Sequence, residues 1–270
     1  MSFASDTLFI AADGSIKAAS DVRSGDSLFG LFGKTNAVRN VTTVTTPLFR
    51  INYPDGYYVV SGDHLICLKT AAFVTDVIGR KHVGGESFII SVEDYLRSSD
   101  EFRANVRGYR VGRVDFADKE LSVDPYELGI IFTNEGFMRR WDRHRLPNRA
   151  VLNSEDNRRE LLAGLADSCG QFGKNVLYLN LNDEGIRRDA MFLAQSLGFT
   201  AYCNENDVLE IRGDFAAIPA ELLALAHSPA ADLLYEISVE ECGEDVAVSI
   251  ELDKHGFMLL DDFSVLHDCE

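Results

Sequence analysis

Short runs of alternating apolar and polar residues, separated by turn sequences, occupy the first hundred positions of the chain. Residues 38–44 and 48–53 both alternate and are rich in β-branched and aromatic side chains. Turn sequences that contain Gly and Asp, at residues 12–15, 24–27 and 61–64, stand between such runs. Closely spaced strands joined by turns of this kind predict an all-β unit.

From about residue 120 the apolar positions follow helical spacing instead. Residues 125–136 form one apolar helical run, a second helix begins after Ser154 as its N-cap, and residues 183–198 form a third. Strand-like segments at residues 176–181 and 208–211 lie between these helices. The pattern therefore changes from β to mixed α/β in this part of the chain.

The strand pattern returns near residue 233. It continues in four short segments, at residues 234–239, 246–252, 257–260 and 263–266. We therefore predict a discontinuous, mainly β domain made of residues 1–117 and 233–270. An α/β domain, residues 118–232, is inserted into it.

The composition is that of a soluble globular protein, because 46% of the 270 residues are apolar and 26% are charged. The chain has no run of about 18 apolar residues, which is the length that a membrane span needs. The N-terminus also lacks the basic region of a signal peptide. The five cysteines form no C-x-x-C pair, which argues against a disulfide framework or a zinc ribbon. We therefore expect an intracellular protein without a metal or other cofactor.

The net charge of −17 is concentrated towards the end of the chain, where the last 38 residues hold one Lys and 11 acidic residues. A protein that binds nucleic acid through its phosphates needs a large basic surface. The basic stretch at residues 139–149 is a candidate DNA contact, but it reads more simply as a solvated face paired with acidic residues. Dedicated nucleic-acid binding is therefore not expected.

Candidate reactive side chains gather near the two ends of the chain. Ser2 supplies a hydroxyl near the start, the motif Ser61-x-x-His64 follows a predicted strand, and three adjacent groups lie near residue 270. These three are the imidazole of His267, the carboxylate of Asp268 and the thiol of Cys269. Acyl transfer requires a hydroxyl or thiol nucleophile together with a group that moves protons.

Four segments in this order resemble the splicing blocks of inteins, self-excising elements whose Hint fold is shared with hedgehog autoprocessing domains. Residues 2–13, with their continuation to residue 26, are similar to the first block, and residues 58–68 to the second, with Ser61 where Thr is usual. Residues 252–269 resemble the last blocks, which end in His-Asn followed by Cys, Ser or Thr. The likeness is greatest to inteins of eukaryotic nuclear proteins.

The resemblance implies a Hint domain that splices itself out of a host protein. Ser2 would attack the carbonyl carbon of Met1 in an N-to-O acyl shift. His64 would polarise the scissile peptide, and the Ser61 hydroxyl would hydrogen-bond the developing charge. The flanking exteins of the host protein would be covalent partners, and we expect the chain to be a monomer.

The resemblance assigns the later steps to the end of the chain. Cys269 would take the acyl group from Ser2 by transesterification. His267 would then help residue 268 to cyclise, which cuts the chain before Cys269 and lets the exteins ligate. Asp262, or alternatively Asp261, would assist Ser2 or Cys269 from the penultimate block.

Two residues differ from the usual pattern of the family. Ser2 stands where Cys is more common, and a hydroxyl is hardly ionised at neutral pH. Asp268 stands where Asn is usual, so its cyclisation would pass through an anhydride instead of a succinimide. Both changes fit a slow or trapped splicing element, whether the two residues are natural or introduced.

Two further motifs lie in the predicted insert. Residues 121–129 resemble the opening of the first dodecapeptide helix of LAGLIDADG homing endonucleases, and residues 162–170 resemble the second copy. Residues 188–198 are similar to the helix that follows the second copy. The resemblance therefore covers about residues 118–232.

A homing endonuclease needs an acidic residue near the foot of each motif helix, because two carboxylates share divalent metal ions there. The second acid position holds Cys169, which is no oxygen ligand for Mg²⁺. The first position holds either Asn134 or Glu135, depending on how the motif is aligned. Only about 25 residues separate the motifs, too few for the usual sheet between them. We interpret the insert as a degenerate relic without nuclease activity or DNA binding.

Two other classes of function remain as alternatives. An active site-specific DNA endonuclease would cut DNA in a metal-dependent reaction. A non-catalytic binding domain would show neither cutting nor splicing, and would place residues 2, 64, 267 and 269 far apart. A splicing element would change the masses of a longer precursor without any other component.

Overall fold

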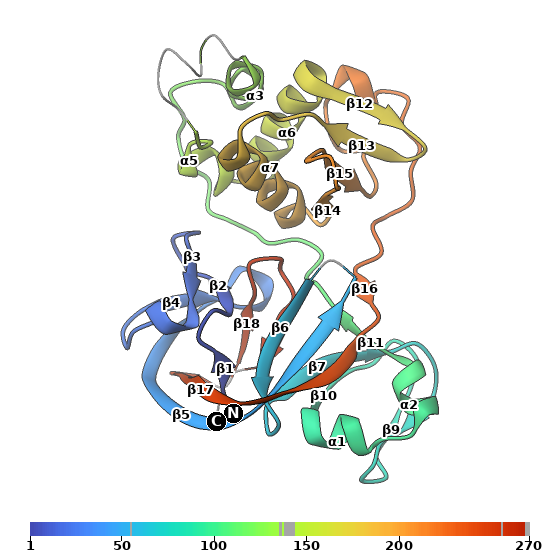
Figure 1. Ribbon diagram of the computed structural model, residues 1–270. Helices are drawn as coiled ribbons and strands as arrows, with labels where there is room; N and C mark the ends of the chain where they lie inside the picture. The colour runs from blue at the N-terminus through green and yellow to red at the C-terminus, as the bar shows by residue number, and fades with distance from the viewer. Residues whose placement is uncertain (55, 135–136, 138–143, 255, 268–270) are drawn as a thin grey trace. The chain divides into compact units, whose positions relative to one another are not determined.

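The computed structural model describes residues 1–270 except 55, 135–136, 138–143, 255 and 268–270. The described chain forms two compact units (Figure 1). Met1–Val111 and Leu234–Glu270 make up the first, here called the β unit, and Gly112–Leu233 the second, here called the α/β unit. The sequence placed these boundaries at residues 117/118 and 232/233. The expectation of a mainly β fold is confirmed.

The first sheet of the β unit is organised by two long strands that run side by side in opposite directions (Figure 1). The strand order is β17–β1–β6–β5–β4, and β17 also pairs directly with β5. The strands are β1 (Phe3–Ala4), β4 (Ser27–Phe29), β5 (Thr35–Tyr53), β6 (Gly56–Ser61) and β17 (Ser238–Leu252). Phe3 pairs with Val60 of β6 and with Val248 of β17, so the start of the chain is held inside this sheet.

The second sheet of the β unit receives the other end of the chain. Its path is β16–β11–β7–β19–β18, and β10 also pairs with β7. The strands are β7 (Leu65–Thr70), β10 (Ser87–Ser91), β11 (Val106–Tyr109), β16 (Leu234–Tyr235), β18 (Phe257–Leu259) and β19 (Val265–His267). Leu266 of β19 pairs with Ile66 of β7.

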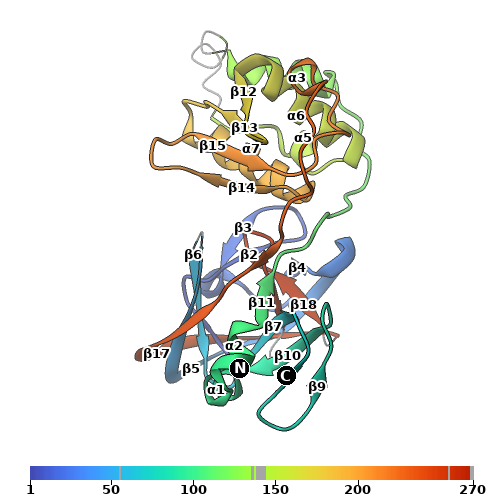
Figure 2. The same cartoon turned by 90° about the vertical axis from the view of Figure 1, so that its right-hand side faces the viewer.

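Smaller elements complete the β unit (Figure 2). They are β2 (Leu8–Ile10), β3 (Ile16–Ala18), β8 (Val74–Thr75), β9 (Lys81–His82), the helices α1 (Val92–Arg97) and α2 (Asp100–Ala104), and the 3₁₀ turns η1 (Ala19–Asp21) and η2 (Leu31–Gly33). Phe3, Phe9, Val60 and Leu266 lie in one buried core with side chains from both sheets. The core therefore fixes the strands that carry both ends of the chain.

The α/β unit contains an antiparallel sheet of four strands in the order β12–β13–β15–β14. The strands are β12 (Gly170–Gly173), β13 (Val176–Leu179), β14 (Thr200–Cys203) and β15 (Leu209–Arg212). The helices are α3 (Pro125–Thr133), α5 (Asn148–Val151), α6 (Glu155–Cys169) and α7 (Glu184–Ser196), with a 3₁₀ turn η3 (Glu221–Leu223). Leu177, Leu209 and Ile211 of the sheet share a buried core with the helices.

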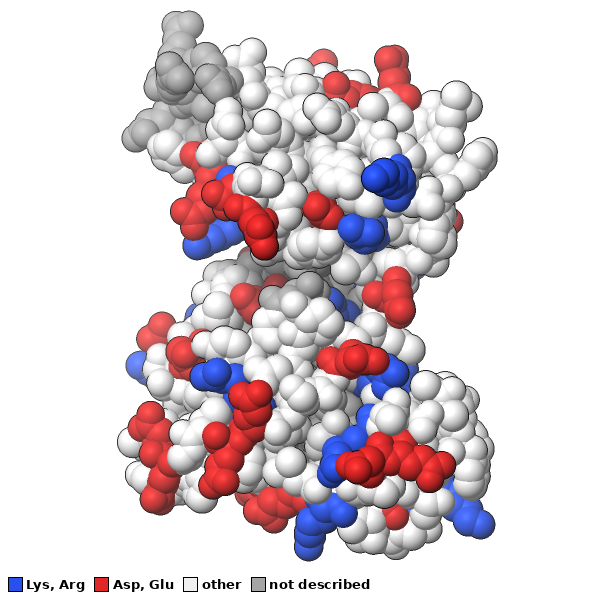
Figure 3. Space-filling model, turned by 45° about the vertical axis from the view of Figure 1, so that its right-hand side comes forward, with Lys and Arg blue, Asp and Glu red and all other residues white. Residues whose placement is uncertain are grey.

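The predicted helix boundaries are close to those observed, with one difference in capping. Ser154 occupies the N-cap of α6 but its side chain makes no capping hydrogen bond, whereas Asp183 caps α7 by accepting from two backbone amides. No helix among the described residues is long and apolar enough to cross a membrane. On the face in Figure 3, Lys and Arg stand among Asp and Glu and form no continuous basic surface in the described part.

Candidate functional site

The turn between β6 and β7 is the place where both ends of the β unit meet. β6 ends at Ser61 next to β1, and β7 begins at Leu65 next to β19. Because β1 and β19 are the strands nearest the chain ends in sequence, this topology brings residues near 2 and near 267 to the same turn. Residues 61–64 of this turn are the Ser-x-x-His motif identified in the sequence.

The peptide bond between Met1 and Ser2 lies against the Ser61 side chain. The Ser2 amide donates to Ser61 Oγ at 2.7 Å, and the Ser61 amide donates to the Ser2 carbonyl at 2.9 Å. Both serines are buried. A buried amide must be hydrogen-bonded to avoid a desolvation cost, and here the hydroxyl of Ser61 satisfies the amide of the predicted scissile peptide.

Asp63 is the residue of this turn that the sequence analysis missed. Its Oδ1 accepts the Ser61 hydroxyl at 2.5 Å, and its Oδ2 accepts the α-ammonium of Met1 at 2.8 Å. Burial opposes ionisation, but these hydrogen bonds outweigh it and hold the pKa of Asp63 below its usual range. The sequence predicted that the Ser61 hydroxyl hydrogen-bonds the developing charge of the reaction. In the structure this hydroxyl donates to Asp63, and its role in the reaction stays a prediction.

His64 is fully buried beside Phe3, with ring centroids 4.7 Å apart. Within the part of the chain that the structure describes, neither ring nitrogen has a hydrogen-bond partner. Burial, together with the positive charge of Met1, lowers the pKa of His64 to about 3. The imidazole is therefore neutral at pH 7 and can accept a proton or donate a hydrogen bond to a reacting group.

His267 lies on the strand that pairs with the start of β7. Its ring contacts Phe257 edge to face, with centroids 5.3 Å apart. The pairing of Leu266 with Ile66 places His267 next to the start of β7, and His267 is the smallest of the contributions that lower the pKa of His64. Asp268 and Cys269 lie outside the described residues. The structure thus brings Ser2, Ser61, His64 and His267 to one region of the β unit.

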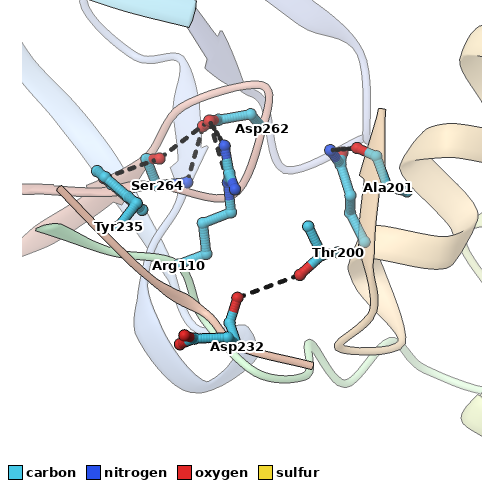
Figure 4. Close-up of polar contacts among 8 residues, drawn as sticks. Arg110, Thr200, Ala201, Asp232, Tyr235, Asp262 and Ser264 are labelled. Atoms are coloured by element: carbon cyan, nitrogen blue, oxygen red, sulfur yellow. Dashed lines mark hydrogen bonds and ion pairs between the residues drawn. The ribbon is translucent and has the colours of Figure 1, made fainter. Parts of the chain in front are cut away.

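Asp262 belongs to a different polar cluster (Figure 4). Its Oδ2 accepts from Arg110 Nη2 at 2.9 Å and from the Ser264 hydroxyl at 3.0 Å, and the Ser264 amide donates to Oδ1 at 2.9 Å. Tyr235 donates its hydroxyl proton to Ser264 Oγ at 3.0 Å. These contacts commit both carboxylate oxygens to Arg110 and Ser264, and the assistance predicted for Asp262 in acyl transfer stays a prediction.

Asp261, the alternative to Asp262, has an unfavourable environment for its charge. Burial and the neighbouring charge of Asp262 raise the pKa of Asp261 to about 6. Because the folded chain holds the proton more tightly than the unfolded chain, this group favours folding below pH 4, and the contribution is lost as the pH rises through 6.

Asp261→Asn should therefore raise the free energy of unfolding by about 1–3 kcal/mol at pH 8 and leave it nearly unchanged at pH 4. Urea unfolding at the two pH values, followed by circular dichroism, measures this difference. Asp262→Asn is the matched control and should destabilise the chain at pH 8, because it removes the ion pair between Asp262 and the buried Arg110 guanidinium. An equal effect of Asp261→Asn at both pH values would contradict the assignment.

In the α/β unit, the two predicted motif helices cross with their backbones in contact at a pair of glycines. A Cβ atom built on Gly164 of α6 would lie 2.0 Å from the Tyr126 carbonyl oxygen and 3.1 Å from Gly129 Cα. A Cβ atom on Gly129 of α3 would lie 2.6 Å from the Leu161 carbonyl oxygen. Only glycine permits this approach, since it carries no side chain.

The residues at the C-terminal ends of the two helices are separated in sequence by the same number of positions as Gly129 and Gly164. Thr133 and Ser168 follow at equal distances along the helices, and their hydroxyls hydrogen-bond to each other. The next residues are Asn134 and Cys169. Of the two open alternatives, the helix pairing therefore favours Asn134 as the counterpart of Cys169, and Glu135 lies outside the described residues.

Neither helix foot provides a carboxylate at the counterpart positions. Asn134 Oδ1 accepts from the Phe137 amide at 3.1 Å, and Cys169 Sγ donates to the Leu165 carbonyl at 3.3 Å. Burial raises the pKa of the Cys169 thiol to about 11, so the sulfur stays protonated at neutral pH. In the described ranges, no group of three or more His, Cys, Asp and Glu side chains is arranged to hold a metal ion.

Comparisons with known proteins give weak similarities. No protein-family profile and no curated protein sequence matches the chain. Among solved structures, the gp41-1 intein is 10% identical, with 99% of this chain and 98% of that chain covered at a TM-score of 0.35. A variant of the Ssp DnaB mini-intein is 7% identical, with 99% of each chain covered at a TM-score of 0.38. The MchDnaB-1 intein is 19% identical over 33% of this chain and 82% of that chain, at a TM-score of 0.23. Likenesses at these scores carry no weight for the function.

Proposed function

We propose that the chain is an autocatalytic protein-splicing element of the intein type, most similar to those of eukaryotic nuclear proteins. The observation that carries this proposal is the placement of the Met1–Ser2 peptide on Ser61, beside a buried neutral His64. The strand that ends at His267 reaches the same turn. A binding domain without chemistry has no need to bring these groups from opposite ends of the chain.

The first step follows from these groups. The Ser2 hydroxyl attacks the carbonyl carbon of Met1, and the acyl group moves from the nitrogen to the oxygen of Ser2. His64 accepts or supplies the proton in this exchange, since its ring is neutral and its nitrogens have no hydrogen-bond partner among the described residues. Hydroxyl attack is slow, which fits a slow or trapped element.

The later steps are carried over from the intein resemblance. Cys269 takes the acyl group from Ser2, and Asp268 then cyclises with help from His267, which releases the element. Extein ligation completes the reaction. The flanking exteins are the covalent partners, and the chain acts as a monomer within an intracellular host protein.

We further propose that the α/β unit is a relic of a LAGLIDADG homing endonuclease. The crossing at Gly129 and Gly164 supports a pair of equivalent motif helices. Asn134 and Cys169 stand where two carboxylates would have to share metal ions, so we propose that the unit neither cuts nor recognises DNA.

The test is a precursor with one small folded protein fused before Met1 and another after Glu270. Mass spectrometry of the purified precursor should show products of cleavage or splicing without any added component. Hydroxylamine, which cleaves esters, should release the N-terminal protein from the parent precursor. Ser2→Ala should abolish this release, and His64→Ala should reduce it by about 10²- to 10⁴-fold.

His227→Ala is the matched control, because His227 is an exposed histidine of the other unit and should leave the release unchanged. Absence of any release from both the parent precursor and a Ser2→Cys precursor would contradict the proposed function. Equal release from the parent and the Ser2→Ala precursor would contradict the role of Ser2.

A further inference from the structure

Asp63 binds the positively charged α-ammonium of Met1. The proposed reaction creates a second ammonium group one residue further on, at the nitrogen of Ser2. In the structure, Asp63 Oδ2 binds the α-ammonium of Met1 at 2.8 Å. Its Oδ1 accepts the proton of the Ser61 hydroxyl, and the same hydroxyl accepts the amide of Ser2. The carboxylate is therefore separated from the Ser2 nitrogen by a single hydroxyl group.

The acyl shift changes the charge at the Ser2 nitrogen. A bond forms between Ser2 Oγ and the carbonyl carbon of Met1, and the bond from that carbon to the Ser2 nitrogen breaks. The hydroxyl proton passes to the nitrogen, giving an amine. An α-amine has a pKa of about 7.7–8.0, so it binds a further proton from water at pH 7. A neutral amide thus becomes an ammonium group.

We propose that Asp63 is a positioning residue that favours the ester form by stabilising the new α-ammonium of Ser2 across the Ser61 hydroxyl. This role rests on the proposed splicing function. In a precursor with an N-terminal extein, the nitrogen of Met1 is an amide and does not neutralise Asp63. The carboxylate then remains connected to the Ser2 nitrogen through the Ser61 hydroxyl.

The direction of the hydrogen bonds agrees with this role. Ser61 donates its proton to Asp63, and so it presents a lone pair to the Ser2 nitrogen. An ammonium group has only protons to donate, and the same lone pair can accept one of them. The arrangement therefore suits the ester state without a rotation of the Ser61 side chain.

The test uses the fused precursor described above, with hydroxylamine as the probe of the ester. Asp63→Asn keeps an oxygen that can accept from Ser61 but removes the charge, and Asp63→Glu keeps the charge. Hydroxylamine release should fall by between about fourfold and about 300-fold in Asp63→Asn, the range given by two unit charges about 5 Å apart between the dielectric of bulk water and that near a protein surface. Asp63→Glu should retain most of the release of the parent.

A second measurement distinguishes the loss of the Asp63 charge from a structural defect caused by the substitution. The Asp63 side chain is 63% exposed, so dissolved salt should screen its charge. The difference in hydroxylamine release between the parent and Asp63→Asn should become smaller as the salt concentration rises from about 0.05 to about 1 M. The free energy of unfolding should stay similar for the two chains. Asp100→Asn, at an acidic side chain that is 97% exposed, is the matched control and should leave the release unchanged.

The outcomes distinguish the two proposals. If the parent and Ser2→Cys precursors release nothing, the splicing function is wrong and the role of Asp63 with it. If the parent releases its N-terminal protein and Asp63→Asn releases it equally fast, the splicing function stands and the role of Asp63 is overturned. A loss in Asp63→Asn that salt does not diminish would also overturn it, because that loss would be structural.

Discussion

Gly164→Ala is expected to unfold the α/β unit while the β unit stays folded. Alanine normally stabilises a helix interior relative to glycine by about 0.5–1 kcal/mol. At this position, however, the new Cβ atom would lie 2.0 Å from the Tyr126 carbonyl oxygen and 3.1 Å from Gly129 Cα. Both are backbone atoms of the partner helix, so no side chain can move aside. Separating α3 from α6 should cost more than about 4 kcal/mol, in the range that marks severe overpacking.

Gly173→Ala is the matched control, because a Cβ atom there would meet no other atom within 4 Å. Its effect on the free energy of unfolding should stay within about 0.5 kcal/mol. Hydrogen exchange of backbone amides reports on the two units separately. In Gly164→Ala, the amides of β13 should lose their protection from exchange, and the amides of β6 and β7 should keep theirs. Unchanged protection of β13 would show that the two helices do not pack through these glycines.

The same variant tests whether the proposed splicing activity depends on the α/β unit. Every group that the first step needs belongs to the β unit, which has a core of its own. Hydroxylamine release from a Gly164→Ala precursor should therefore match that of the parent. Loss of release while the β unit keeps its protection would show that the α/β unit takes part in the reaction.

The strand pattern of the β unit could be predicted, but the length of its strands could not. The alternating pattern predicts two separate segments, residues 38–44 and 48–53, and Pro47, which has no amide to donate, lies between them. In the structure β5 continues through Pro47 opposite Glu244, and β17 shifts its register between Glu241 and Gly243. Gly243 has a φ of +85°, which suits this irregularity. The length of β5 depends on its pairing with β17, which is distant in sequence. A local pattern of apolar and polar residues holds no information about that pairing.

Residue chemistry predicted part of the site for a similar reason. Ser2, Ser61 and His64 could be identified because their segments resemble the splicing blocks of inteins, and the resemblance implies their roles. Asp63 was missed because its role depends on the shape of the turn. The pairing of Asp262 with Arg110 joins residues 152 positions apart, which spacing does not reveal.

Arg158 shows the same limit within the α/β unit. In the sequence it is one charged residue near the start of a predicted helix. In the structure it is fully buried, with hydrogen bonds to the carbonyls of Asn153, Ser196 and Val114 at 2.9, 2.9 and 2.6 Å. Charged side chains are rarely buried, so only the long-range structure can identify such a position.

Asp268→Asn is expected to accelerate C-terminal cleavage at least about tenfold, which corresponds to about 1.4 kcal/mol of the activation barrier. The amide nitrogen of asparagine can attack its own carbonyl carbon and leave a stable succinimide. An aspartate carboxylate must instead form a strained anhydride, which water hydrolyses. The parent chain should therefore release Cys269-Glu270 slowly. Time-resolved mass spectrometry of the two chains measures the difference.

The role of the neighbouring imidazole can be tested in the faster chain. His267 contacts Phe257 at the end of β19, directly before residue 268. If its ring protonates the leaving amine of Cys269, adding His267→Ala to Asp268→Asn should slow the release again by about 10²- to 10⁴-fold. His227→Ala in the same background should have no effect, since it removes an imidazole from the other unit. Equal cleavage with aspartate and with asparagine at position 268 would show that another group cuts the chain, because the two side chains differ only in the atom that performs the attack.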